Sequence, residues 1–223
     1  MRQGSFPALP RIQQDPWSSL KRLAQRREFR QKQILYRDGD AANELYLLEQ
    51  GRVQLFRRSS QGRNLTLSIV EPGDLFGEMV LFPRGTQESD AQALTDGVVW
   101  VVPRQKMEQL LPQEPALPLL IMENLGRRLQ TVERRLGDLA FKSVPQRLAA
   151  LLLDLAGPAA VRSRGPARLP HRYTHQQLAE MINTHRETVT KVFNLFRDDR
   201  LLSSNRQGIV LLDMDRLREM ALR

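Results

Sequence analysis

The stretch from Tyr173 to Phe196, YTHQQLAEMINTHRETVTKVFNLF, predicts two short helices joined by a tight turn. On a helix that advances by about 100° per residue, the polar side chains of the second half fall within an arc of about 140°. The polar arc holds Arg186, Glu187, Thr190, Lys191 and Asn194, and the opposite, apolar arc holds Val189, Val192, Phe193 and Phe196. This helix can therefore pack on a small core and offer its charged face to the major groove of DNA.

The residues around this stretch complete a winged-helix pattern between 142 and 223. Thr174 and Gln177 have the spacing of a capping box, which opens the first helix of the pair. Before it, KSVPQRLAALLLDLAG predicts an amphipathic helix that ends at Gly157, and a loop follows. After it, residues 201–212 predict a hairpin with a polar tip. A helix, a helix–turn–helix and a hairpin in this order outline a winged-helix DNA-binding domain.

Residues 17–112 have a different, β-rich pattern. Short runs such as ILY, ELYLLEQ, RVQLFRR, NLTLSIV and VVWVV alternate with turn signals at spacings of about ten residues. This spacing favours a sandwich or barrel over alternating strands and helices. Glycines supply the positive φ that tight turns require, and they stand where the turns are expected, at Gly39, Gly51, Gly62 and Gly73. Residues 1–16, polar and rich in proline, are expected to form a loose arm.

Residues 113–141 predict one long helix with a narrow apolar seam. The seam residues are spaced alternately by three and four positions, as in a heptad repeat, and are flanked by charged residues. They are Met122, Leu125, Leu129, Val132, Leu136 and Leu139. The strict spacing favours a homodimer that forms along this helix. The alternative is an ordinary amphipathic helix that packs on its own domain.

Composition excludes several classes of function. The chain has 223 residues, 41% of them hydrophobic, which suits a folded protein, and a net charge of +9, which favours polyanionic partners. It has no cysteine, so disulfides, thiolate metal sites, iron–sulfur clusters and cysteine nucleophiles are excluded. We find no secretory signal and no apolar run long enough to cross a membrane, and we therefore expect a cytoplasmic protein without a membrane partner.

The chain resembles the catabolite activator and anaerobic regulator (Crp–Fnr) family of transcription factors from about Trp17 to Asp213. The resemblance rests on FGEMVLF around Gly77, on RRLQTVERRLGDLAF in the long helix, and on THQQLAEMINTHRETVTKV. It implies an α+β fold: an N-terminal cyclic-nucleotide-binding-like β-roll (a jelly roll), a dimerisation helix and a C-terminal winged helix–turn–helix. It also implies double-stranded promoter DNA and RNA polymerase as partners. By analogy, the polymerase would touch residues 157–172 or the β-roll.

By the same resemblance, Arg186, Glu187 and Lys191 match the base-reading residues of the family. Lys191 stands where arginine is common, and it lacks the two-pronged guanidinium that reads guanine. Residues Gln176, His185 and Thr188 match positions that contact phosphates. Glu187 has a structural alternative, because its spacing from Thr184 would also make a capping box.

The effector pocket departs from the pattern of the members that bind cAMP. Gly77, Glu78 and Ser89 match that pattern, but Glu88 stands where an arginine holds the cyclic phosphate. Asp90 follows, and two carboxylates that face a phosphate would repel it. In the long helix, Val132 and Glu133 replace the hydroxyl residues that contact adenine. We therefore expect a vestigial pocket that does not bind cAMP, filled by side chains or by another effector.

Other cofactors of the family are not expected either. Haem sensing generally needs a histidine in the sensor domain. All three histidines lie in the DNA-binding half: His171, His175 and His185. The sequence suggests no metal site and no catalytic residue. We expect a dimeric regulator, an activator rather than a repressor, that recognises a two-fold-symmetric, TGTGA-like promoter site independently of cAMP. The alternatives are a regulator with an unidentified effector, a sensor that signals through a partner protein, and a cupin-like enzyme with a DNA anchor.

Overall fold

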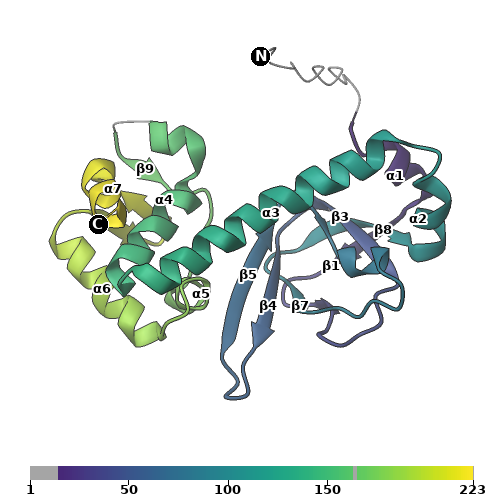
Figure 1. The fold of residues 1–223 in the computed structure, drawn as a ribbon. Coiled ribbons are helices and arrows are strands. Elements are labelled where there is room, and N and C mark those ends of the chain that lie inside the picture. The colour runs from purple at the N-terminus through teal and green to yellow at the C-terminus, as the bar shows by residue number, and fades with distance from the viewer. Residues whose placement is uncertain (1–14, 163–164, 223) are drawn as a thin grey trace, which may run out of the picture.

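The computed structural model describes residues 15–162 and 165–222, which form two lobes joined by one long helix (Figure 1). The N-terminal lobe consists of two antiparallel sheets with short helices, and the C-terminal lobe consists of helices and a small sheet. Helix α3 (Ala116–Phe141) reaches from one lobe to the other. The predicted α+β fold, with a β-roll, a long helix and a winged helix, is confirmed. Most of the predicted N-terminal arm, residues 1–14, lies outside the described residues.

The two sheets of the N-terminal lobe each have four strands. Their strand orders are β1-β8-β3-β6 and β2-β7-β4-β5, and all neighbours are antiparallel. The first sheet contains β1 (Gln25–Phe29), β3 (Glu44–Gln50), β6 (Leu75–Phe76) and β8 (Gly97–Pro103). The second contains β2 (Ile34–Tyr36), β4 (Val53–Arg58), β5 (Asn64–Val70) and β7 (Asp90–Ala93).

Five of these strands lie where the sequence predicted them: β2, β3, β4, β5 and β8. The other three have weak sequence patterns, because β1 is mostly exposed and β6 and β7 are short. The four turn glycines all have positive φ, as expected. The strands were therefore predictable wherever they carry β-branched or large apolar residues, and not where the pairing of neighbouring strands alone defines them.

Two apolar clusters stabilise the N-terminal lobe. One lies between the sheets and includes the rings of Phe29, Tyr36, Tyr46 and Phe76. The other joins the first sheet to the short helices and to the start of α3, and includes Trp17, Leu20, Leu45, Met107, Leu117 and Ile121. The helices concerned are α1 (Ser18–Leu23), η1 (Glu78–Leu81) and α2 (Arg104–Leu110). The second cluster therefore anchors α3 to the N-terminal lobe.

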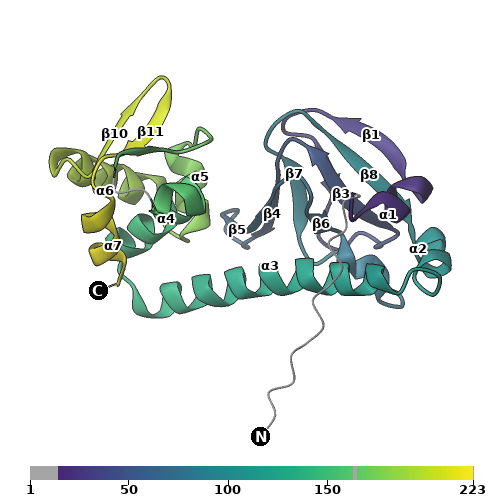
Figure 2. The same cartoon turned by 90° about the horizontal axis from the view of Figure 1, so that it is seen from above.

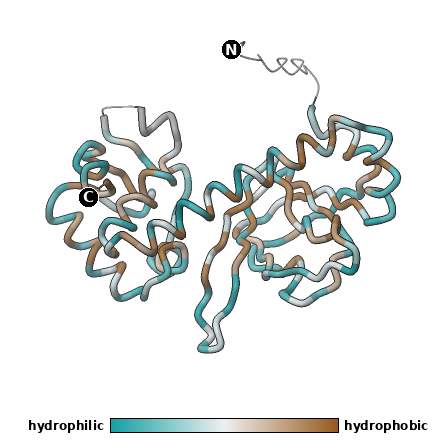
Figure 3. The backbone as a smooth tube through the Cα atoms, viewed as in Figure 1, coloured by the Kyte–Doolittle hydropathy of each residue, from teal (hydrophilic) through white to brown (hydrophobic). Residues whose placement is uncertain are grey.

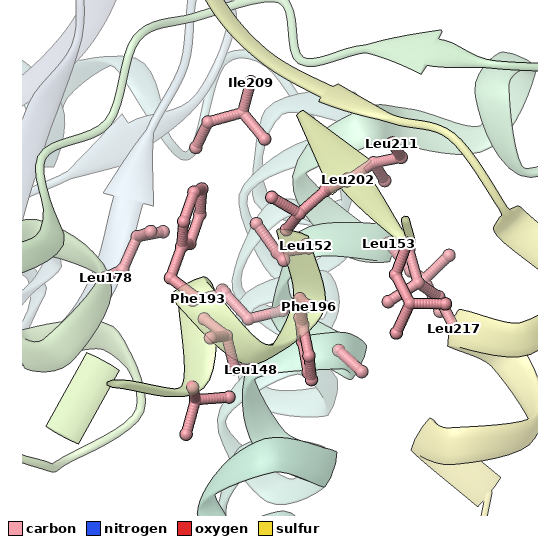
Figure 4. Close-up of a cluster of buried hydrophobic side chains, with 14 of the residues drawn as sticks. Leu148, Leu152, Leu153, Leu178, Phe193, Phe196, Leu202, Ile209, Leu211 and Leu217 are labelled. Carbon is pink, nitrogen blue, oxygen red and sulfur yellow. The ribbon is translucent and has the colours of Figure 1, made fainter. Parts of the chain in front are cut away.

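The C-terminal lobe is a winged helix. It contains α4 (Val144–Arg162), α5 (His175–Met181), α6 (Arg186–Asp198) and α7 (Met214–Leu222). The three-stranded sheet, of order β10-β11-β9, consists of β9 (Ala167–Arg168), β10 (Leu202–Asn205) and β11 (Gly208–Leu211). Figure 4 shows Leu148 and Leu152 of α4 packed among side chains from α6 and the sheet. At Gly157, where the sequence predicted the end of a helix, the helical backbone of α4 is interrupted, with a φ of 81°.

Seen from above, both lobes lie on the same side of α3 (Figure 2). The opposite flank of the helix is uncovered, although α3 carries hydrophobic as well as hydrophilic segments along its length (Figure 3). Among the helices of residues 15–162 and 165–222, we find none that is long and apolar enough to span a membrane.

Direct contacts join the two lobes beneath α3. Gln54 on β4 donates a hydrogen bond to Glu180 on α5, at 3.1 Å, and Arg52 donates one to the hydroxyl of Tyr173, at 3.3 Å. Arg134 on α3 forms an ion pair with Asp154 on α4, at 2.6 Å. The outer face of the second sheet and the winged helix therefore share a polar interface.

Candidate DNA-binding surface and effector pocket

The helix–turn–helix is built from α5 and α6. The side chain of Thr174 accepts a hydrogen bond from the backbone N–H of Gln177, at 3.1 Å, and the side chain of Gln177 accepts one from the N–H of Thr174, at 2.9 Å. The predicted capping box is thus confirmed. It satisfies two N–H groups that the first turn of α5 leaves without partners.

Helix α6 has the two faces that the sequence predicted. Its apolar face is buried in the core of the lobe, with Val189, Val192, Phe193 and Phe196 each at most 6% exposed. The three predicted base-reading side chains, Arg186, Glu187 and Lys191, are exposed. The structure therefore brings these three together on an open helix face, with the core holding the helix in place.

The alternative role of Glu187 in helix capping is wrong. The N-cap of α6 is His185, one residue beyond Thr184, and no side chain caps the helix. Within the part of the chain that the structure describes, the carboxylate of Glu187 has neither a hydrogen bond nor an ion pair. The negative charge in the first turn suits the helix dipole and is free to meet a partner.

A hydrogen bond that sequence reasoning missed fixes α6 on α5. The Nδ1 atom of His175 lies 2.8 Å from the hydroxyl oxygen of Thr190, which donates its own proton to the carbonyl of Arg186. Because the Thr190 hydroxyl already donates its proton, Nδ1 of His175 carries a proton and donates it to the Thr190 oxygen. Partial burial and the neighbouring Arg186 guanidinium lower the pKa of His175, which favours the neutral ring.

The predicted phosphate-contacting residues border the charged face. Gln176 and His185 are exposed, and Thr188 is half-buried. The side-chain amide of Gln176 donates to Glu180 at 2.9 Å, which holds it at the start of α5. These three side chains are accessible to a DNA sugar–phosphate backbone that would pass over the first turns of α5 and α6.

Aromatic rings pack in the interior of the β-roll, next to the predicted pocket residue Gly77. The rings of Tyr36, Tyr46 and Phe76 have centroids 4.9–6.1 Å apart and are almost fully buried. Gly77 has a φ of 75°, and a Cβ atom there would come within 2.7 Å of the Tyr46 ring. Burial, with the nearby Glu78 carboxylate, raises the pKa of Tyr36, whose hydroxyl interacts with the side chain of Ser89 and the backbone of Gly77.

Glu78 is held by a partner on α3 that the sequence analysis did not identify. Arg128 donates two hydrogen bonds to its carboxylate, at 2.7 and 3.0 Å, in a two-pronged ion pair. The side chains are 25% and 18% exposed, respectively. A usable signal exists, because Asn124, Arg128 and Arg135 recur at helical spacing on one side of the predicted helix.

The remaining predicted pocket residues do not come together. Glu88 is turned to the surface, where it pairs with Arg57 at 3.7 Å, and its side chain is 68% exposed. Asp90 is buried and accepts a hydrogen bond from the N–H of Asp38, at 3.2 Å. Our expectation that both carboxylates face one phosphate is therefore wrong, since only Asp90 points inward. Val132 and Glu133 are exposed on α3.

The apolar seam of α3 is only partly covered by its own lobe. Leu125 packs on the cluster that anchors the helix, and Leu139 is half-buried. The other four seam residues are exposed by between 38% and 66%: Met122, Leu129, Val132 and Leu136. We refer to these four as the α3 stripe. The helix thus presents large apolar side chains that neither lobe contacts fully.

Two family models match the chain. A model of cyclic nucleotide-binding domains matches residues 26–114, and a model of Crp-like helix-turn-helix domains matches residues 146–220. The first corresponds to the β-rich lobe and the second to the winged helix. No cluster of three or more potential metal ligands occurs in the described ranges, 15–162 and 165–222.

Relatives cover most of the chain. The cAMP-activated global transcriptional regulator CRP of Pasteurella multocida is 30% identical over 181 residues, 81% of this chain and 86% of that protein. The CRP-like cAMP-activated global transcriptional regulator of Mycobacterium tuberculosis is 28% identical over 200 residues, 90% of this chain and 89% of the relative. These relatives are transcription regulators, not enzymes.

Solved structures have the same fold. The c-di-GMP-responsive global regulator CLP of Xanthomonas campestris superposes with a TM-score of 0.78 at 25% identity and covers 88% of this chain and 98% of that one. A CRP/FNR-family transcriptional regulator of Thermus thermophilus superposes with a TM-score of 0.74 at 28% identity and covers 89% and 99%.

We predict that Arg128→Ala destabilises the protein by about 1–3 kcal/mol, because it leaves Glu78 charged, partly buried and without its partner. Partial exposure of the pair keeps the loss below that of a fully buried one. Urea unfolding followed by circular dichroism measures it. The double variant Glu78→Gln with Arg128→Met should recover most of the loss. Equal losses in the single and the double variant would contradict an electrostatic origin.

Proposed function

Because the chain belongs to the CRP/FNR family of transcription regulators, we propose that it is a homodimeric, sequence-specific activator that binds a two-fold-symmetric promoter site. The observation that carries the proposal is the set of Arg186, Glu187 and Lys191, exposed on a helix whose other face is fully packed. RNA polymerase is the second partner in this proposal, and the cytoplasm is the compartment. The proposed polymerase-contacting segment, residues 157–172, includes residues 163–164, which lie outside the described residues.

Each charged residue of α6 has a chemical role in this proposal. Arg186 presents a planar guanidinium that can donate to O6 and N7 of a guanine, and Glu187 can accept from the amino group of a cytosine. Lys191 contributes a single point charge, so it contacts a guanine without the two-pronged geometry. Guanine and cytosine contacts at these positions agree with a TGTGA-like half-site. Gln176, His185 and Thr188 hold the phosphates and set the register.

The α3 stripe supports the dimer. A two-fold-symmetric site requires two recognition helices whose separation is fixed, and a parallel pairing of α3 from two protomers would fix it. Exposed apolar residues at heptad spacing are the surface that such a pairing buries. Leu129 and Leu136 lie one heptad apart, and their side chains are 58% and 66% exposed.

The filled β-roll supports independence from cAMP. The relatives from Pasteurella and Mycobacterium are cAMP-activated, but here the Tyr36 hydroxyl lies against Gly77 and Ser89. No arginine takes the place of Glu88, which is turned outward. A cyclic phosphate would have to displace a buried tyrosine and would gain no guanidinium partner at that position. The alternative is a regulator whose effector binds elsewhere in the molecule.

We predict that the full-length protein shifts a duplex with two inverted TGTGA-type half-sites in preference to a scrambled duplex. Arg186→Ala should lose about 1–3 kcal/mol of discrimination at one guanine, because the residue reads a base. Competition mobility-shift assays with single-base variants measure this. Gln176→Ala should weaken binding to all sequences alike, and the remote Arg37→Ala should change neither quantity. A wild-type protein without preference over scrambled DNA would refute the proposed function.

We predict that the wild-type protein is a dimer and that Leu129→Glu shifts it to a monomer, since the charge would be buried in the pairing of two stripes. Sedimentation velocity at micromolar concentrations measures this. Gln130→Glu adds the same charge at the neighbouring exposed position, outside the stripe, and should leave the dimer intact. If both variants stay dimeric, the interface lies elsewhere.

We predict that cAMP changes neither DNA binding nor thermal stability, because buried side chains occupy the cradle where its phosphate would bind. Mobility shifts and melting curves with and without 1 mM cAMP, about the upper end of ordinary ligand concentrations, test this. Melting of a cAMP-activated relative under the same conditions provides the positive control. A cAMP-dependent rise in melting temperature or in DNA affinity would overturn the assignment.

A further inference from the structure

A cavity of about 330 Å³ lies between the two lobes, away from the interior of the β-roll. One wall is α3, the second is the outer side of β5 with the turn that follows it, and the third comes from α4 and Tyr173. Ile69 on this side of β5 packs against the core of the C-terminal lobe, whereas Val70 points into the β-roll. Gly77 and Ser89 do not line the cavity, although Arg128 of its α3 wall pairs with Glu78.

Four arginines of α3 line this cavity: Arg127, Arg128, Arg134 and Arg135. Three of them form ion pairs, with Glu123, Glu78 and Asp154, respectively. Arg135 is the exception. In the part of the chain that the structure describes, its side chain makes one hydrogen bond, to the carbonyl of Leu67 at 3.1 Å, and no ion pair.

The charge of Arg135 is thus both poorly hydrated and poorly neutralised. Burial lowers the pKa of this guanidinium, and Asp154, the acid whose charge acts on it, is already paired with Arg134. A guanidinium remains charged at neutral pH even so. It has several N–H groups in a fixed fork that suits the oxygens of a phosphate or a carboxylate. An anion in the cavity would supply the missing partner.

The wall that faces these arginines carries carboxylate and hydroxyl groups. Burial raises the pKa of Glu71, and Asp74 already accepts hydrogen bonds from the N–H of Glu71 and from Asn124. The hydroxyl of Tyr173 accepts a bond from Arg52 and keeps its own proton to donate. This wall can therefore bind hydroxyl or amino groups of a ligand while the arginine wall binds its charge.

We propose that this interlobe cavity binds a small phosphorylated metabolite, with its phosphoryl group at Arg135 and its hydroxyl groups toward Glu71 and Tyr173. The volume lies in the range of small-molecule sites, and polar groups of both signs converge on it. Dimerisation would leave the cavity open. At about 100° per residue, Arg127 and Arg135 lie roughly 120–160° around α3 from Leu129 of the stripe.

Binding in this cavity is coupled to the arrangement of the lobes. Its walls come from both of them, so a ligand that contacts all three walls stabilises the present orientation of the winged helix relative to α3. Thermodynamic linkage then requires the ligand to raise DNA affinity if DNA-bound protein prefers this orientation. The ligand lowers DNA affinity if DNA-bound protein prefers another orientation. The coupling rests on the proposed function, whereas the binding does not.

The test uses the full-length protein without DNA and three probes: ribose 5-phosphate, inorganic phosphate and uncharged ribose. Isothermal titration calorimetry and melting curves at constant ionic strength give the affinities. Ribose 5-phosphate should bind more tightly than phosphate, and ribose should not bind. Arg135→Gln should weaken ribose 5-phosphate by about 10- to 100-fold, the loss of one charge-assisted contact. Arg37→Gln, which removes an exposed arginine that does not line the cavity, should have no effect.

Circular dichroism checks that Arg135→Gln is folded, and Arg127→Gln at the exposed side of the same cavity provides a second variant with a smaller expected loss. Absence of binding to the wild type, or binding that neither substitution weakens, would overturn the site. A mobility shift with and without ribose 5-phosphate then tests the coupling. Probe binding with unchanged DNA affinity would refute the coupling alone, and probe binding without any DNA binding would refute the proposed function alone.

Discussion

Helix α3 has to satisfy three different neighbours at once, and the rest of the structure depends on how its residues are divided among them. Leu117, Ile121 and Asn124 face the N-terminal lobe and are buried there. Leu129 and Leu136 face away from both lobes, and Arg134 and Arg135 face the winged helix. Because a helix repeats every 3.6 residues, these assignments are fixed together. Inserting one residue would rotate every later side chain by about 100° and exchange the faces.

The parts of this division that were predictable are those with a periodic sequence. The heptad spacing of the α3 stripe, the two faces of α6 and the capping box at Thr174 follow from local rules that need no knowledge of distant residues. Five strands were visible for the same reason. The pairing of Glu78 with Arg128 was not, because 50 residues separate them in the sequence. The position of Glu88 was also beyond prediction, since a single residue of shift along an irregular strand turns a side chain from inside to outside.

Local rules also gave one wrong alternative, at Glu187. Thr184 and Glu187 have capping-box spacing, but α6 begins at Arg186, with His185 as its N-cap. The N–H of Thr184 donates a hydrogen bond to the carbonyl of Ala179, which closes the turn between the helices. The backbone of Thr184 therefore belongs to this turn and not to the start of α6. The tertiary contact between α5 and α6, reinforced by His175 and Thr190, therefore sets the helix start. A consequence is that, among the described residues, the carboxylate of Glu187 has no hydrogen-bond or ion-pair partner.

In the β-roll, Glu78 of the predicted effector pocket already has a protein partner. A pocket that holds a charged ligand must leave polar groups unpaired until the ligand arrives, which costs stability. Here Tyr36, Tyr46 and Phe76 pack into the interior, and Arg128 satisfies Glu78 directly. The pair of Glu78 and Arg128 ties the start of η1 to α3. Arg135, in contrast, keeps its charge in a poorly hydrated position next to the joint between the lobes and forms no ion pair within the described residues. If unpaired polar groups mark the place where a ligand binds, in this molecule they favour the outside of β5 over the inside of the β-roll.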